Sequence, residues 1–172
     1  MNHYEIASYN PLSSNFVIPS SFEPIRRYAP EEVLSADAIA KFNQTGLPMR
    51  EVQMFTTPPC KITGIHIDGD VISNKAAVNY VTGSIGIMKW YEYLKEELTR
   101  HRTPAGTDYI LLSPEDCREI DSLALTKLTL VQVCVPHNIV NMSNSYRYCF
   151  SIRFHEAYTF EEMLEIMKGI SW

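Results

Sequence analysis

The sequence lacks several features that would assign it to a specialised class of protein. Its four cysteines are scattered and form no Cys-x-x-Cys pair, which argues against a zinc finger and against a disulfide framework in 172 residues. No apolar run approaches the roughly 18 residues that span a membrane, and no signal peptide is recognisable at the start. A net charge of −5 argues against a general nucleic-acid binder. We therefore expect a cytoplasmic protein with neither nucleic-acid nor membrane partners.

The composition that remains is typical of a single globular domain. Hydrophobic residues make up 45% of the chain and charged residues 20%, and the length suffices for a sizeable core. Residues 1–29 are rich in Ser, Asn, Pro and Tyr and predict an irregular or edge-strand arm. A helix is expected to begin at Pro30 and to end by about residue 45, because Gly46 and Pro48 follow.

Short alternating strands separated by turn residues dominate the middle of the chain. They predict antiparallel β-structure, with strands near residues 50–55, 61–67, 76–81, 85–91, 127–135 and 146–154. A charged segment at about 92–126 interrupts this pattern, and Ser113-Pro114 predicts a helix there that runs to about Leu123. Thr159 is expected to cap a closing helix.

The order of these elements predicts a mainly β fold. We expect one domain over residues 1–172, a double-stranded β-helix (a jelly roll, cupin-like) with flanking helices. Its parts are an N-terminal arm and helix at 1–48, a jelly-roll core at 49–156 with an insertion at about 92–126, and a C-terminal helix at 157–172.

One strand carries the first candidate site. His66 and Asp68 are two residues apart, so they project from the same face of the strand. A histidine and a carboxylate in this arrangement supply two of the three ligands in the facial triad of non-haem iron enzymes. Asp70 is a rival carboxylate. An ordinary Asp-Gly turn after a strand, with a half-buried histidine, is the alternative reading of this segment.

A second group of candidates lies near the C-terminus. Pro136 ends one strand and leaves His137 at its rim. The last strand then alternates sharply, and its non-aromatic face carries four side chains: Arg147, Cys149, Ser151 and Arg153. A buried guanidinium needs an anion, so this face predicts a site for a carboxylate ligand, because arginine binds carboxylates with two parallel hydrogen bonds. Exposure of this face to solvent is the alternative.

These residues together resemble a known superfamily. The order of His66 and Asp68, then His137, then an arginine ten residues later is similar to the iron(II)- and 2-oxoglutarate-dependent oxygenases. Residues 136–153 in particular resemble the aspartyl/asparaginyl β-hydroxylase-like members. The resemblance covers roughly residues 50–155.

The resemblance implies a function and a role for each residue. His66, Asp68 and His137 would be the Fe(II) ligands. Arg147 would hold the distal carboxylate of the co-substrate 2-oxoglutarate, with Ser151 beside it, and Arg153 competes for that role. The reaction would be a dioxygen-dependent hydroxylation of an unactivated C–H bond in a small molecule or peptidyl side chain.

Several alternatives remain open at this stage. Asn79 lies on a strand where its amide could reach the co-substrate, although an ordinary strand asparagine also fits. The segment at about 92–126 is a candidate lid over the site. Two other functions are compatible with the sequence: a metal-dependent cupin enzyme that uses no 2-oxoglutarate, and a non-catalytic jelly-roll binding module.

Overall fold

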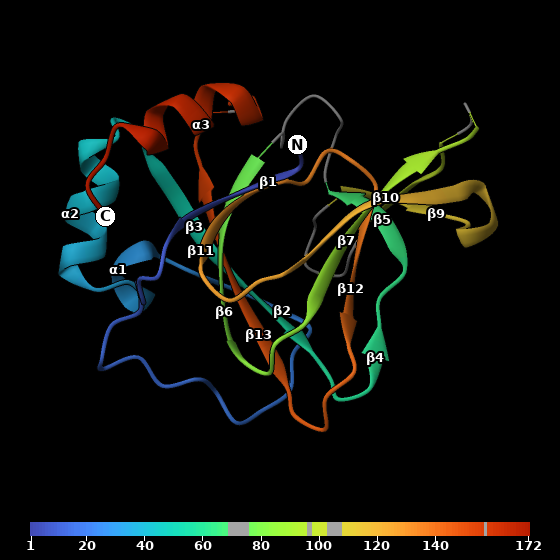
Figure 1. Cartoon of the computed structure of the whole chain (residues 1–172). Coiled ribbons are helices and arrows are strands. Elements are labelled where there is room, and N and C mark those ends of the chain that lie inside the picture. The colour runs from blue at the N-terminus through green and yellow to red at the C-terminus, as the bar shows by residue number, and fades with distance from the viewer. Residues whose placement is uncertain (69–75, 96–97, 103–107, 157) are drawn as a thin grey trace.

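The computed structural model describes residues 1–68, 76–95, 98–102, 108–156 and 158–172 (Figure 1). The described chain is mainly β. It forms two antiparallel sheets with few helices, an arrangement consistent with a β-sandwich. The prediction of a mainly β fold with flanking helices is confirmed at this level.

The first sheet has six strands in the order β1-β11-β6-β13-β3-β2, all antiparallel. The N-terminal arm supplies both of its edges, as expected for an edge-strand segment. Its strands are β1 (His3–Ala7), β2 (Ile25–Tyr28), β3 (Met49–Thr57), β6 (Ala76–Gly83), β11 (Leu128–Gln132) and β13 (Arg147–Phe154).

The second sheet has seven strands, six of them in the order β10-β7-β12-β5-β9-β8, while β4 pairs with β12. They are β4 (Lys61–Ile62), β5 (Ile65–Asp68), β7 (Ile87–Tyr93), β8 (Arg100–Arg102), β9 (Asp108–Leu112), β10 (Cys117–Ala124) and β12 (His137–Asn141). The strand expected at 61–67 is therefore two strands, interrupted at Thr63-Gly64.

Helices cover the outer face of the first sheet, at the left of Figure 1. They are α1 (Pro30–Val33), α2 (Ala36–Gln44) and α3 (Phe160–Lys168). Alternation on the strands sends one set of side chains to this side, where a large apolar core forms from residues that include Phe42, Val52, Met54, Val78, Phe150, Ile152, Phe160, Met163 and Met167. The other face of the same strands is left for the interior between the sheets.

Local hydrogen bonds explain where the helices begin and end. The single helix expected from Pro30 is broken, because Ser35 N–H bonds to the carbonyl of Pro11 in the N-terminal arm. The Ser35 hydroxyl then caps α2 by accepting from Ala38 N–H at 3.1 Å. The cap expected at Thr159 is confirmed, since Thr159 and Glu162 form a reciprocal capping box.

The helix expected from Ser113 to about Leu123 is wrong. The Ser-Pro signal produces only one 3₁₀ turn, η1 (Pro114–Asp116), after which β10 begins at Cys117. β10 pairs with β7 from Cys117 to Ala124 with one irregularity at Ile120, and Arg118 forms an ion pair with Glu92 across the two strands. Pairing with a neighbouring strand has here overridden a local helix signal. No described helix is long and apolar enough to cross a membrane.

Gly83 ends β6 at a φ of 82°, a backbone conformation that favours glycine. A Cβ added there would overlap the carbonyl oxygen of Tyr146. We expect Gly83→Ala to lower the free energy of unfolding by about 3 kcal/mol, from backbone strain and steric overlap, as measured by chemical denaturation.

Gly46→Ala is the matched control for this prediction. Gly46 also has a positive φ of 71°, but a Cβ there would meet no atom within 4 Å. Gly46→Ala should therefore lower the free energy of unfolding only by the backbone-strain contribution, about 1 kcal/mol. Equal losses at the two positions would show that contact with Tyr146 is unimportant.

Candidate functional site

His66 and Asp68 project from β5 into the interior between the two sheets. The alternate residues Ile65 and Ile67 lie on the opposite face, in a separate apolar cluster with Ile110. The alternation predicted from the sequence is therefore confirmed, and the apolar packing on one face fixes the direction of the two polar side chains on the other.

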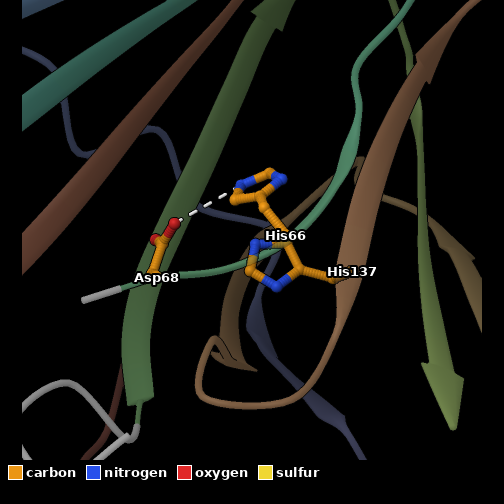
Figure 2. Close-up of side chains that lie close together, drawn as sticks. All are labelled: His66, Asp68 and His137. Carbon is orange, nitrogen blue, oxygen red and sulfur yellow. Dashed lines mark ion pairs between the residues drawn. The ribbon is translucent and has the colours of Figure 1, made fainter. Parts of the chain in front are cut away.

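The third polar side chain comes from the neighbouring strand. His137 on β12 is the register partner of His66 on β5, and their ring centroids are 4.5 Å apart. Figure 2 shows that His66, Asp68 and His137 converge on one region. One ligand atom from each lies within 4.8 Å of the others. Two imidazoles and a carboxylate at this spacing are able to hold one divalent ion.

Backbone carbonyls orient both imidazole rings. His66 Nδ1 lies 2.9 Å from the carbonyl oxygen of Gly64, and His137 Nδ1 lies 2.9 Å from that of Val135. Because a carbonyl only accepts, each Nδ1 must donate its proton. That leaves Nε2 on each ring as the atom able to bind a metal ion, and a histidine whose other nitrogen donates to a backbone carbonyl is common around protein metals. His66 Nε2 lies 3.4 Å from Asp68 Oδ1, the contact dashed in Figure 2.

The protonation states of the three side chains differ. Burial acts to raise the pKa of Asp68, but the hydrogen bond from His66 and the charge of Arg153 outweigh it and hold that pKa well below its usual range. Burial acts to lower the pKa of His66, yet the adjacent Asp68 raises it overall. Burial and the charge of His66 lower the pKa of His137 to about 4. At neutral pH the site therefore offers an ionised carboxylate and a neutral His137.

The triad opens onto a cavity of about 230 Å³ between the sheets. Strand β13 forms one wall, and every second residue along it faces the cavity: Arg147, Cys149, Ser151 and Arg153. Asn79 on the adjacent β6 is the register partner of Ser151 and also lines the cavity. The face is buried, so the alternative of a solvent-exposed face is wrong. Apart from Asp70, which lies outside the described residues, all the residues singled out as ligand-binding candidates lie around this one cavity.

Arg153 connects the two sheets through the site. Its Nη2 donates to Asp68 Oδ2 at 2.8 Å, and both side chains are largely buried. This ion pair leaves Asp68 Oδ1 directed toward His66. The sequence patterns did not predict this contact, because Asp68 and Arg153 are 85 residues apart in the chain.

No acidic residue in the described part of the chain forms such a pair with Arg147. Arg147 is 1% exposed, and its Nε and Nη2 have no hydrogen-bond partner among the described residues. Its side chain passes close to Gly86, where an added Cβ would lie 2.5 Å from Arg147 Cδ and 2.8 Å from Nε. The sequence patterns did not single out Gly86 as a neighbour of the site, although a glycine inside a predicted strand indicates close approach by another group.

Two other expectations, on Asp70 and on the segment at about 92–126, have different outcomes, and one further histidine can be placed. Asp70, the rival carboxylate, lies outside the described residues. His101 lies on the exposed strand β8, where its ring stacks obliquely on Tyr109, the register partner of Asp68, and it does not line the cavity. None of the described residues in the segment 92–126 lines the cavity, and most of them belong to strands of the second sheet.

The two arginines predict opposite effects on stability. Arg147→Met should leave the free energy of unfolding within about 1 kcal/mol of wild type or raise it, because an unpaired buried charge is removed. Arg153→Met should lower it by about 2–3 kcal/mol, because Asp68 loses its counter-ion. Denaturation of the metal-free protein measures both, and an equal loss in the two variants would contradict this charge assignment.

Comparison with known proteins adds little to this geometry. No protein-family model matches the chain, and no curated protein matches it. A solved structure described as "X-Ray structure of E. coli ycfD" is similar at 16% sequence identity with a TM-score of 0.37. The match covers 75% of this chain and 31% of that one, so this chain spans under a third of that protein's length. The function must therefore be argued from the site itself.

Proposed function

We propose that the protein is an iron(II)- and 2-oxoglutarate-dependent dioxygenase built on a double-stranded β-helix, and that it hydroxylates an unactivated C–H bond. The observation that carries this proposal is the pairing of two features in one cavity. The cavity is lined by a cluster of two histidines and one carboxylate. It is also lined by Arg147, whose buried Nε and Nη2 have no hydrogen-bond partner among the described residues. A metal-chelating dicarboxylate satisfies both features at once.

The side chains present fit a divalent iron ion. His66 and His137 would bind through Nε2, since each Nδ1 is committed to a backbone carbonyl. Asp68 would bind through a carboxylate that Arg153 keeps ionised and oriented. Nitrogen and carboxylate ligands with open positions suit non-haem Fe(II). The ion would supply the activation of dioxygen, for which protein side chains have no redox chemistry of their own.

Arg147 is suited to the distal carboxylate of 2-oxoglutarate. Its guanidinium is desolvated and pairs with no carboxylate of the described residues, so a bound carboxylate would relieve an unfavourable charge. Ser151, expected beside Arg147, faces the same cavity but lies four residues from Arg147 along β13 and two from Arg153, so we leave it free for a second ligand. Arg147 would align the co-substrate toward the triad before reaction.

The main alternative is a metal-dependent cupin enzyme that uses no 2-oxo acid. It would explain the three ligands but would give Arg147 no anion to bind. A non-catalytic binding module would leave both the triad and the buried arginine without a purpose. We therefore favour the 2-oxoglutarate-dependent reaction.

The direct test is anaerobic addition of Fe(II) and 2-oxoglutarate to the protein. We expect a visible charge-transfer band from the chelate and, after admission of dioxygen, formation of succinate. His137→Ala should abolish the band because it removes a ligand, whereas Arg147→Met should raise the concentration of 2-oxoglutarate needed by at least about tenfold, about 1.4 kcal/mol.

His101→Ala is the matched control, since this histidine lies on an exposed strand and does not line the cavity. It should leave the band unchanged. Metal binding with no band would favour the cupin alternative, and absence of metal binding altogether would favour the non-catalytic one.

Gly86→Ala tests the position of Arg147 without changing its charge. The new methyl group must displace the arginine side chain, so we expect the affinity for 2-oxoglutarate to fall by about tenfold while Fe(II) binding is retained. Gly46→Ala, which meets no neighbouring atom, should leave both affinities unchanged. Unaltered affinity in Gly86→Ala would argue against the role assigned to Arg147.

A further inference from the structure

A second set of polar atoms in the cavity is not used by the proposed function. These are Nε and Nη1 of Arg153, Oγ of Ser151 and Oδ1 of Asn79, none of which has a hydrogen-bond partner among the described residues. The three side chains are 4%, 1% and 7% exposed. Folded proteins rarely leave buried polar atoms unpaired, so a group of such atoms around one cavity indicates a ligand.

The strand register places this set beside the metal-binding cluster. Ser151 and Asn79 are directly opposite each other on β13 and β6. Arg153 follows two residues along on the same face, and its Nη2 already holds Asp68. Arg147 is six residues away along β13, about 20 Å between Cα atoms at the usual strand rise. The two arginines therefore enter the cavity from opposite ends of one strand.

The charges in the cavity favour a second anion. Two arginines and a divalent ion carry four positive charges, whereas Asp68 and 2-oxoglutarate together carry three negative ones. One positive charge would remain in a site that excludes much of the solvent, and a monoanion would neutralise it. Ser151 Oγ and Asn79 Oδ1 also accept hydrogen bonds, so the ligand should present an N–H or O–H group near its negative charge.

We propose that Arg153, Asn79 and Ser151 bind the carboxylate end of the substrate. The substrate class is then a carboxylic acid with a hydrogen-bond donor close to the carboxylate, either a small free acid or an acidic side chain. Arg153 is both the positioning residue for Asp68 and the anchor for the substrate. This inference rests on the proposed function for the identity of the second ligand, but the carboxylate site itself does not require it.

The first experiment compares three matched probes on the anaerobic complex with Fe(II) and saturating 2-oxoglutarate. The probes are 3-hydroxybutanoate, butanoate and 3-hydroxybutanamide, and their binding is measured by calorimetry. The first acid should bind at least tenfold more tightly than its amide, and removal of its hydroxyl should weaken binding about threefold. A blocked aspartate, acetyl-aspartyl-methylamide, distinguishes a small free acid from an acidic side chain as the source of the carboxylate. If it binds as tightly as the free acid, the site is assigned to acidic side chains.

Variants then locate the site. Asn79→Asp places a negative charge beside Arg153 and should weaken acid binding at least tenfold, while the 2-oxoglutarate chelate band is retained. Asn79→Ala is the uncharged comparison and should weaken it about threefold. Arg153→Gln should remove the preference for the acid over the amide, and the Asn79 variants keep the test decisive if Arg153→Gln does not fold.

The outcomes separate this inference from the proposed function. If wild type gives no chelate band, the proposed function fails. The carboxylate site is then tested in the metal-free wild type, where Arg147, Arg153 and Asp68 leave one positive charge. A preference for 3-hydroxybutanoate over its amide that Asn79→Asp removes supports the site, and a preference that Asn79→Asp leaves unchanged contradicts it. If the band forms but acid and amide bind equally, if none of the probes binds, or if Asn79→Asp binds the acid as wild type does, the second carboxylate site is wrong.

Discussion

The ion pair between Arg153 and Asp68 is the interaction on which the candidate site depends. It spans the interior from β13 in the first sheet to β5 in the second. Burial alone would favour a neutral Asp68, and such a carboxyl group would be a poor metal ligand. The hydrogen bond from His66 and the charge of the guanidinium keep it ionised. The single hydrogen bond from the guanidinium to Oδ2 leaves Oδ1 directed at His66. The same contact therefore joins the two sheets and prepares a ligand.

Positive charge in the cavity is the second constraint. Arg147 and Arg153 share one face of one strand, so strand alternation forces both into the same enclosed space. Asp68 is the carboxylate that β5 supplies against them. A protein selected for stability alone would gain by replacing such a group with an apolar one. Retaining an unpaired buried arginine makes physical sense where a ligand completes the pair.

Sequence patterns predicted the faces of strands better than the contacts between them. The alternation in residues 147–154 correctly separated an apolar face from a polar one, and the spacing of His66 and Asp68 correctly placed them together. The partner of Arg153 was not predictable, because it depends on how two sheets lie against each other. The helix expected before Leu123 failed for a related reason: its capping signal was local, whereas pairing of β10 with β7 is not.

The chemistry of the guanidinium explains why arginine, and not lysine, suits position 153. An ammonium group is a compact point charge, and Asp68 would neutralise most of its field. The planar guanidinium directs five N–H donors in fixed directions. One of them holds Asp68, while Nε and Nη1 remain available on other edges of the same plane. A single side chain can thus orient a metal ligand and still present donors to a second anion. This geometry would join the proposed metal site to the proposed site for the substrate carboxylate.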